Sequence, residues 1–260
     1  MKIVTVGDNC MDVYQSSGKA YPGGNPVNVA VYLRGLGAHT AYVGWVGSDQ
    51  YADMMIGSIY HKGVDISHVF KKEGKTAVTY VDLVGNDRKF GEYEEGVMAH
   101  FLLTEDDLNY INGFDHVHAG IWGHTEKYFP LLKKMGLTTS FDFSDKLEHA
   151  LVKIITPHVD YPFFSYEKDD ENIRSYLKEI YQTGSKVAVA TLGENGSIAY
   201  DGNEYYTYGI VTAEVVDTMG AGDSFISGFL YGKMKGFTTV ECLKLGAETA
   251  AKTISYFGAW

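Results

Sequence analysis

The run Asp217-Thr218-Met219-Gly220-Ala221-Gly222-Asp223 places small residues and a carboxylate at the expected start of a helix. Because Gly220, Ala221 and Gly222 carry almost no side chain, their backbone N–H groups can approach a phosphate closely, and the helix dipole favours negative charge there. Asp223 could then take the proton of a substrate hydroxyl as that oxygen attacks a terminal phosphoryl group. The pattern predicts a phosphoryl-transfer site with Asp223 as its base.

A plainer interpretation of this loop is a tight turn in which Asp223 caps a helix. Two common nucleotide sites do not fit the sequence. No G-x-x-x-x-G-K-[ST] run occurs, and Phe225 stands where a dinucleotide-binding loop needs its third glycine. The choice between a phosphate site and a simple turn therefore depends on the rest of the chain.

A second candidate segment, Gly23-Gly24-Asn25-Pro26-Val27-Asn28, lies near the other end of the chain. Paired glycines let a backbone approach a ligand closely, and the amide of Asn28 can hold a sugar hydroxyl as both donor and acceptor. The alternative is an ordinary helix start, with Asn25 as the N-cap and Pro26 at the first helical position. Taken alone, this segment leaves both interpretations open.

Together, the two motifs, in this order and so far apart, make the chain resemble the ribokinase-like (pfkB) family of carbohydrate kinases over nearly its whole length. The resemblance implies transfer of the γ-phosphoryl group of ATP to a primary hydroxyl of a sugar, with Mg²⁺ as a further cofactor and monovalent-cation dependence left open. Other runs typical of the family are Gly7-Asp8-Asn9-Cys10-Met11-Asp12, Trp45-Val46-Gly47-Ser48-Asp49, Gly63-Val64-Asp65 and Thr191-Leu192-Gly193-Glu194-Asn195-Gly196.

The resemblance also implies roles for individual residues. Asp223 matches the catalytic base, and Gly220, Ala221 and Gly222 match the anion hole that would neutralise charge on the transferred group. Arg88 falls in the segment where relatives carry a lid arginine, which could touch the phosphate or the substrate. The expected sugar-binding residues are Asp12, Gly23, Gly24 and Asn28, and the expected nucleotide-binding residues are Thr191, Leu192, Gly193 and Ser165.

The expected substrate is fructoselysine, phosphorylated on its 6-hydroxyl, because several runs are most similar to family members that act on this sugar. Cys10 replaces an asparagine common at the sugar site, which argues against plain ribose. Two alternatives stay open: a kinase of the same family for another sugar or nucleoside, such as fructose, ribose or adenosine, and a noncatalytic sugar- or nucleotide-binding protein. The runs in question are Glu95-Gly96-Val97-Met98-Ala99, Ile121-Trp122-Gly123-His124, Phe141-Asp142-Phe143-Ser144-Asp145-Lys146 and Gly258-Ala259-Trp260.

The metal site departs from the family pattern. Relatives often carry an Asn-x-x-Glu element tied to magnesium and phosphate, and the corresponding stretch, residues 160–169, contains none. Ser165 stands nearest to the place of that asparagine, and Glu167 or Asp169 could support a hydrated metal ion. Magnesium use is expected, but its ligands are unassigned.

Composition limits the partners and the cellular setting. The net charge is −11, without a basic cluster, and this disfavours nucleic acid or an anionic membrane, which are bound mainly through Lys and Arg. Cys10 and Cys242 offer no disulfide framework, and neither a signal peptide nor a membrane-spanning run is evident. We expect a cytoplasmic protein whose partners are a sugar and ATP.

Short apolar runs alternate with amphipathic segments, which predicts an α/β fold with a doubly wound, mostly parallel sheet flanked by helices. Because the motifs follow strands, they should meet at the carboxyl edge of that sheet. Asp201-Gly202 is the expected turn of a hairpin. The predicted strands lie near residues 2–7, 40–46, 115–121, 138–142, 159–164 and 186–191, and the helices near 25–36, 49–62, 104–112, 125–135, 169–183, 220–235 and 239–256.

Residues 75–94 behave differently, with two extended segments, 76–84 and 88–93, joined by Gly85-Asn86-Asp87. We expect one domain, residues 1–260, that carries a small β lid from segments near 12–22 and 75–94. The resemblance implies that the lid covers the sugar, excludes water and supports a homodimer. The alternative is an ordinary surface hairpin.

Two further clusters could do other chemistry. His116 and His118 alternate along one predicted strand with His124 just beyond, but no Cys or spaced carboxylate completes a metal site, and structural partners are the expected role. Asp142 and Asp145 could form a carboxylate pair for hydrolysis. The favoured interpretation is that these carboxylates end a strand at the ligand-binding edge.

Overall fold

The computed structural model describes residues 2–15, 18–84 and 87–260, and between residues 82 and 90 it describes the backbone alone. The larger of its two sheets has nine strands in the order β13-β12-β11-β10-β9-β8-β1-β4-β5. Neighbouring strands from β11 to β5 pair in parallel, whereas β12 and β13 form an antiparallel hairpin at one edge. The strands are β1 (Lys2–Val6), β4 (His39–Val46), β5 (Asp65–Lys71), β8 (His116–Gly120), β9 (Thr138–Asp142), β10 (Tyr161–Ser165), β11 (Ala188–Thr191), β12 (Ser197–Tyr200) and β13 (Tyr205–Tyr208).

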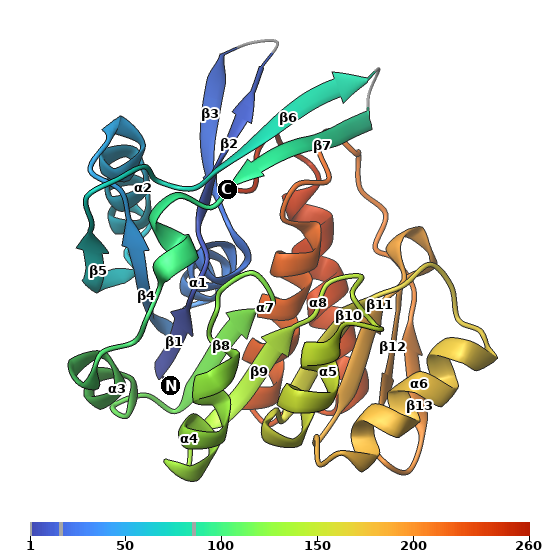
Figure 1. The fold of residues 1–260 in the computed structure, drawn as a ribbon. Coiled ribbons are helices and arrows are strands. Elements are labelled where there is room, and N and C mark those ends of the chain that lie inside the picture. The colour runs from blue at the N-terminus through green and yellow to red at the C-terminus, as the bar shows by residue number, and fades with distance from the viewer. Residues whose placement is uncertain (1, 16–17, 85–86) are drawn as a thin grey trace.

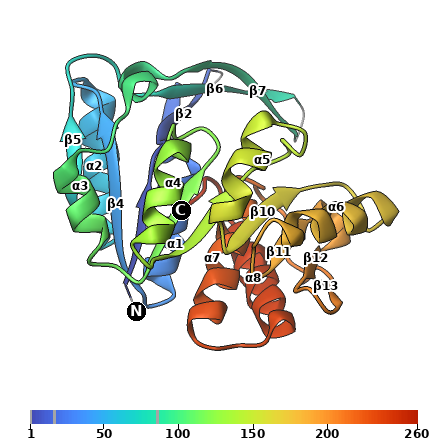
Figure 2. The same ribbon diagram turned by 60° about the horizontal axis from the view of Figure 1, so that its bottom comes forward.

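Helices cover both faces of this sheet and make a three-layer α/β fold (Figures 1 and 2). Alternate residues of β1 show the two faces, because Ile3 and its neighbour Val4 belong to two different clusters of buried hydrophobic side chains. One face carries α1 (Asn25–Gly35), α2 (Gln50–His61), α7 (Ala221–Met234) and α8 (Thr239–Thr253). The other carries α3 (Glu105–Ile111), α4 (Phe129–Lys134), α5 (Ala150–Ile155) and α6 (Glu171–Gln182).

A second sheet has four strands in the order β3-β2-β6-β7. Its strands are β2 (Cys10–Tyr14), β3 (Lys19–Gly23), β6 (Val78–Val84) and β7 (Asp87–Glu94). The pair β2–β6 is parallel, and the other two pairs are antiparallel. Figure 1 shows this sheet projecting from the α/β body on the side toward which β8 and β9 point, which is the edge where ligands bind in doubly wound folds.

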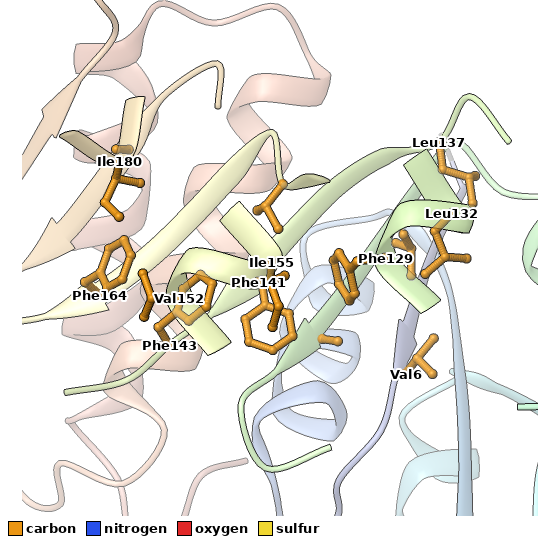
Figure 3. Close-up of a cluster of buried hydrophobic side chains, with 14 of the residues drawn as sticks. Val6, Phe129, Leu132, Leu137, Phe141, Phe143, Val152, Ile155, Phe164 and Ile180 are labelled. Atoms are coloured by element: carbon orange, nitrogen blue, oxygen red, sulfur yellow. The ribbon is translucent and has the colours of Figure 1, made fainter. Parts of the chain in front are cut away.

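An aromatic cluster anchors the carboxyl end of β9 (Figure 3). Phe141 and Phe143 are almost completely buried on either side of Asp142, and the ring of Phe143 stacks on Phe164 with 5.0 Å between centroids. Burying one such ring contributes about 1.5–3 kcal/mol to folding. The backbone that carries Asp142 is therefore held by rings on both sides of it.

Most of the predicted elements are confirmed, including the doubly wound sheet and the hairpin at Asp201-Gly202. The helix predicted near 125–135 is instead a 3₁₀ turn, Glu126–Tyr128, followed by α4. Strand β5 and helix α5 were not predicted, because β5 is a partly exposed edge strand and six residues are too few for helical periodicity to emerge. No helix within the described ranges is long and apolar enough to cross a membrane.

The interpretation of Asn25 as an N-cap is wrong. Gly24 occupies the N-cap of α1 with φ 101°, a conformation that disfavours a side chain, and Asn25 is the first helical residue. Pro26 is at the second helical position and needs no N–H donor there. The side chain of Asn25 is thereby free of a capping role.

Candidate active site

Asp223 lies in the first turn of α7, and helix α1 holds its carboxylate. Asn25 Nδ2 donates to Asp223 Oδ1 at 2.7 Å, and Asn28 Nδ2 donates to Asp223 Oδ2 at 2.6 Å. Both amides come from the first turn of α1, nearly two hundred residues away in the sequence. The fold thus joins the two glycine-containing motifs around one carboxylate.

The start of α7 is shaped for an anion. Gly220 is its N-cap with φ 74° and ψ 4°, and a Cβ atom there would lie 2.5 Å from the hydroxyl oxygen of Tyr32. Within the described part of the chain no side chain caps this helix, and although the N–H of Ala221 donates to the carbonyl oxygen of Thr218, those of Gly222 and Asp223 are available to a bound group. These donors and the helix dipole together favour phosphate beside Asp223.

A cavity of about 570 Å³ opens at this helix end. Its walls include Asp223, Asp142 and the predicted anion-hole residues Gly220, Ala221 and Gly222. A second cavity of about 560 Å³ is more apolar and has Ile210, Val215 and Ala247 among its walls. The two cavities share Ser165, Thr191, Thr218, Ala221 and Gly222. An elongated ligand with a phosphate end and an apolar end, such as a nucleotide, fits this shape.

Three of the four predicted nucleotide-binding residues line these cavities. Ser165 and Thr191 lie where the cavities meet, with 3.3 Å between their hydroxyl oxygens, and Gly193 lines the apolar cavity. Leu192 differs, because its side chain is buried in the core and forms no wall of either cavity. The buried side chain of Leu192 therefore attaches this loop to the hydrophobic core and does not face the space for a ligand.

The predicted sugar residues continue from Asp223 toward the four-stranded sheet. Asp12 is buried on β2, and a Cβ atom at Gly23 would lie 2.5 Å from its Oδ2 atom, so the glycine makes room for the carboxylate. A Cβ atom at Gly24 would lie 2.6 Å from the Cα atom of Asn9. Arg88 was predicted to act in this region, but its side chain lies outside the described part of the structure.

Two more carboxyl groups, Asp8 and Asp142, approach Asp223. Asp142 Oδ2 accepts a 2.9 Å hydrogen bond from the same Asn25 amide that serves Asp223, and its Oδ1 accepts from the backbone N–H of Ser144. Asp8 is 5% exposed, and its Oδ1 has no hydrogen-bond partner among the described residues. Burial, with the negative charge of Asp223 second, raises the pKa of Asp8 to about 7 and that of Asp142 to about 7.

Burial also raises the pKa of Asp223, although the two asparagine amides oppose the shift by stabilising its ionised form. A carboxylate with a raised pKa accepts a proton more readily than an ordinary aspartate does. The geometry and the electrostatics of Asp223 therefore both suit a general base at the mouth of a phosphate site.

The predicted histidine cluster has structural partners. His116 Nε2 and His118 Nδ1 each lie 2.7 Å from Ser140 Oγ, and burial lowers the pKa of both rings to about 3, so both are neutral. His124 instead pairs with Glu95. Over residues 2–15, 18–84 and 87–260 no three His, Cys, Asp or Glu side chains are grouped to hold a metal ion.

The carboxylates considered for hydrolysis or for magnesium differ in their surroundings. Asp145 is an exposed residue that pairs with Lys146, whereas Asp142 lines the cavity of about 570 Å³ at the start of α7. Asp169 forms a two-pronged ion pair with Arg174, with both distances 2.6 Å. Among the side chains that the structure describes, no group forms a dedicated magnesium site, and the metal ligands stay unassigned.

Sequence reasoning missed four residues of this site: Asn25, Asp8, His118 and Trp260. Trp260 Nε1 donates to Asn28 Oδ1 at 2.7 Å, and His118 Nε2 lies 3.0 Å from Asn25 Oδ1. No spacing in the sequence relates either ring to its asparagine, because each pair is joined only by the fold. For Asp8, the signal available was its place directly after a buried strand.

Comparison with known proteins places these features in a family. Residues 3–260 match the pfkB family of carbohydrate kinases. The chain is 48% identical to fructoselysine 6-kinase of Escherichia coli, with 99% of both chains covered, and 34% identical to fructosamine kinase FrlD of Bacillus subtilis, covering 100% of this chain and 93% of that one. Among solved structures, Arabidopsis thaliana ribokinase complexed with ribose and ATP superposes with a TM-score of 0.88 at 20% identity, covering 99% of this chain and 93% of that one.

Proposed function

This chain belongs to the pfkB family of carbohydrate kinases, and from that premise we propose that it transfers the γ-phosphoryl group of ATP to the 6-hydroxyl of fructoselysine. The observation that carries the proposal is the Asp223 carboxylate, held by Asn25 and Asn28 beside the anion-binding start of α7. The relatives named fructoselysine 6-kinase and fructosamine kinase support this choice of sugar.

In the proposed mechanism, the 6-hydroxyl lies between Asp223 and the terminal phosphoryl group. Its O–H bond breaks as the new O–P bond forms, the proton passes to the Asp223 carboxylate, and the bond between phosphorus and the leaving oxygen breaks to release ADP. The N–H groups of Gly220, Ala221 and Gly222 are proposed to stabilise the charge on the transferred group. Asp12, Gly23, Gly24 and Asn28 are proposed to orient the sugar, and Ser165, Thr191 and Gly193 to contact the nucleotide.

Magnesium remains part of the proposal as a companion of the ATP phosphates, whose charge it would neutralise. Because Mg²⁺ retains several water ligands and binds largely through phosphate oxygens in kinases, it does not require a cage of protein carboxylates. Monovalent-cation dependence stays open. The cytoplasmic setting, the closing of the four-stranded sheet as a lid with Arg88, and a homodimer formed through that sheet also remain predictions.

The test is ADP release with ATP and Mg²⁺ across fructoselysine, psicoselysine, fructose, ribose, fructose 6-phosphate and adenosine. We expect fructoselysine to be preferred, and Asp223→Asn to lower kcat by at least about 10³-fold, the scale expected for loss of a general base and the alignment it provides. ATP binding by the variant should persist, because α7 and its glycines are unchanged.

The outcomes separate the alternatives. Preference for another member of the panel would keep the kinase chemistry and replace the substrate. Binding of ATP and sugar without ADP release would support a noncatalytic binding protein. Near-normal turnover by Asp223→Asn would sink the assignment of the base.

A further inference from the structure

Each of the two asparagine amides that hold Asp223 could adopt either of two orientations, with its nitrogen or its oxygen toward the carboxylate. An amide presents N–H groups on one side and an oxygen on the other, and the two orientations have nearly the same shape. If Asn25 or Asn28 turned over, its oxygen would face the Asp223 carboxylate and would favour the protonated form of that acid. Something in the fold must hold both amides with nitrogen toward Asp223.

For Asn28 the answer is Trp260. The indole nitrogen of Trp260 lies 2.7 Å from Asn28 Oδ1, and an indole N–H can only donate. The atom that faces Trp260 must therefore be the amide oxygen, which leaves Nδ2 to face Asp223. Asn28 is only 4% exposed, so water has little access to satisfy a reversed amide.

For Asn25 the answer is a buried chain of three side chains. His118 Nε2 lies 3.0 Å from Asn25 Oδ1, and the opposite ring nitrogen of His118 lies 2.7 Å from Ser140 Oγ. His116 Nε2 lies 2.7 Å from the same hydroxyl. His116 and His118 have 0% relative exposure, and Ser140 is equally buried.

When both rings are neutral and Asn25 Oδ1 faces His118, one arrangement of protons makes all three hydrogen bonds of this chain. His116 Nε2–H donates to Ser140 Oγ, the Ser140 hydroxyl donates to His118 Nδ1, and His118 Nε2–H donates to Asn25 Oδ1. This arrangement leaves His116 Nδ1 as an acceptor, and that atom has no partner among the described residues. The reverse order would place a proton on His116 Nδ1, where a buried N–H would have no acceptor among the described residues, so the donors point from β8 and β9 toward Asn25 and Asp223.

We propose that His118 and Trp260 are positioning residues, whose ring N–H groups lock the amides of Asn25 and Asn28 so that both oxygens of Asp223 face N–H donors. The inference rests on the proposed role of Asp223 as the base. The titratable groups that face Asp223 are Asp8 after β1, Asp142 on β9, Tyr32 on α1 and, through Asn25, His118 on β8.

The test is the pH dependence of kcat, because loss of a locking donor should make Asp223 easier to protonate. His118→Leu and Trp260→Phe are each expected to move the acid limb of kcat upward by roughly one pH unit, the scale of one hydrogen bond to a carboxylate. At a pH on the acid limb, kcat of each variant should therefore be about tenfold below that of the wild type, and the difference should disappear at higher pH. KM for ATP should be unchanged, and the double variant should shift further than either single variant.

His118→Gln is the matched control, because the glutamine amide nitrogen can take the place of the imidazole Nε2–H. It should retain the wild-type acid limb. Should His118→Leu fail to fold, Ser140→Ala probes the same chain, since it removes the donor that fixes the His118 tautomer, and it should also shift the limb upward.

A fall in kcat that is equal at every pH, with the limb unmoved in His118→Leu or Ser140→Ala and in Trp260→Phe, would overturn the inference. Asp223→Asn, measured alongside, separates this failure from failure of the proposed function. If Asp223→Asn is inactive and the limbs are unmoved, only the positioning role is wrong. If Asp223→Asn turns over normally, the base assignment and the positioning role are both wrong.

Discussion

At the scale of single residues, the site brings three carboxyl groups together, and hydrogen bonds from asparagine amides stabilise their negative charge. Asp8 and Asp142 both lie close enough to Asp223 for its charge to raise their pKa values. The side-chain amide of Asn25 donates to Asp142 and Asp223, and its backbone N–H donates to Asp8. Such a cluster is costly to ionise fully in a partly buried place. The cluster therefore lowers the stability of the fold while it raises the pKa of the proposed base, a combination that is common in active sites.

Asp8→Asn should reveal this cost. The pKa of Asp8 is about 7 in the folded protein against an ordinary value of 3.8, so between about pH 4 and pH 7 the folded protein holds a proton that the unfolded chain has released. Stability is then lost as pH rises through this window, and the loss is complete above pH 7. Asparagine cannot ionise, so the variant should be more stable by on the order of 2 kcal/mol at pH 8, with the gain shrinking toward pH 4.

Urea unfolding at pH 8 and near pH 4 measures this difference. Asp53→Asn is the control, because Asp53 is an exposed carboxylate in a surface ion pair with Lys71. A gain of equal size at both pH values would show that the ionisation of Asp8 is not its source.

At the scale of elements, the position of the anion site depends on how α7 packs against α8. A Cβ atom at Gly228 of α7 would lie 2.6 Å from the carbonyl oxygen of Leu245 and 2.8 Å from the Cα atom of Gly246, both in α8. A Cβ atom at Gly246 would in turn lie 2.8 Å from the ring of Phe225. The two glycines let the helix backbones approach closely, and this sets the direction in which α7 points its first turn.

Gly228→Ala should therefore destabilise the protein by about 1–3 kcal/mol, because the added methyl group has no room between the helices. The matched control is Gly57→Ala in α2, where the described structure leaves open space within 4 Å of the added atom. That change should stabilise by about 1 kcal/mol through helix propensity alone. Urea unfolding of both variants tests the pair, and similar effects of the two substitutions would contradict the packing argument.

At the scale of the whole molecule, the nine-stranded body carries the proposed phosphate site, and the four-stranded sheet stands over the same edge of the body (Figures 1 and 2). Strand β2 carries Asp12, and β3 runs directly into Gly23, Gly24 and helix α1. Movement of the small sheet would therefore reach the proposed sugar residues at once. Because of this direct connection, closing of the four-stranded sheet would bring the proposed sugar-binding residues onto the sugar.

Hydrogen exchange measured by mass spectrometry tests that closure. With fructoselysine and a nonhydrolysable ATP analogue bound together, amides of β2, β3 and β6 should exchange more slowly than with either ligand alone, because a closed lid excludes water. Strand β9, buried in the body, serves as the internal reference. Unchanged exchange in the small sheet with both ligands bound would argue for a rigid surface sheet.

Local patterns were enough to predict most of the strands and helices, and they are also what the proposed roles of the start of α7 and of Asp223 rest on. They suffice because helix starts, glycine loops and strand runs are encoded by neighbouring residues. Asn25 was misassigned as an N-cap for the same reason, since local pattern alone favours a cap before Pro26. What only the tertiary structure reveals is which groups surround Asp223 and the two asparagines that hold it: Asp8, Asp142, His118 and Trp260 come from segments far apart in the sequence. Hydrogen bonds and charge effects act over a few ångströms, and the folded chain alone determines which groups come that close.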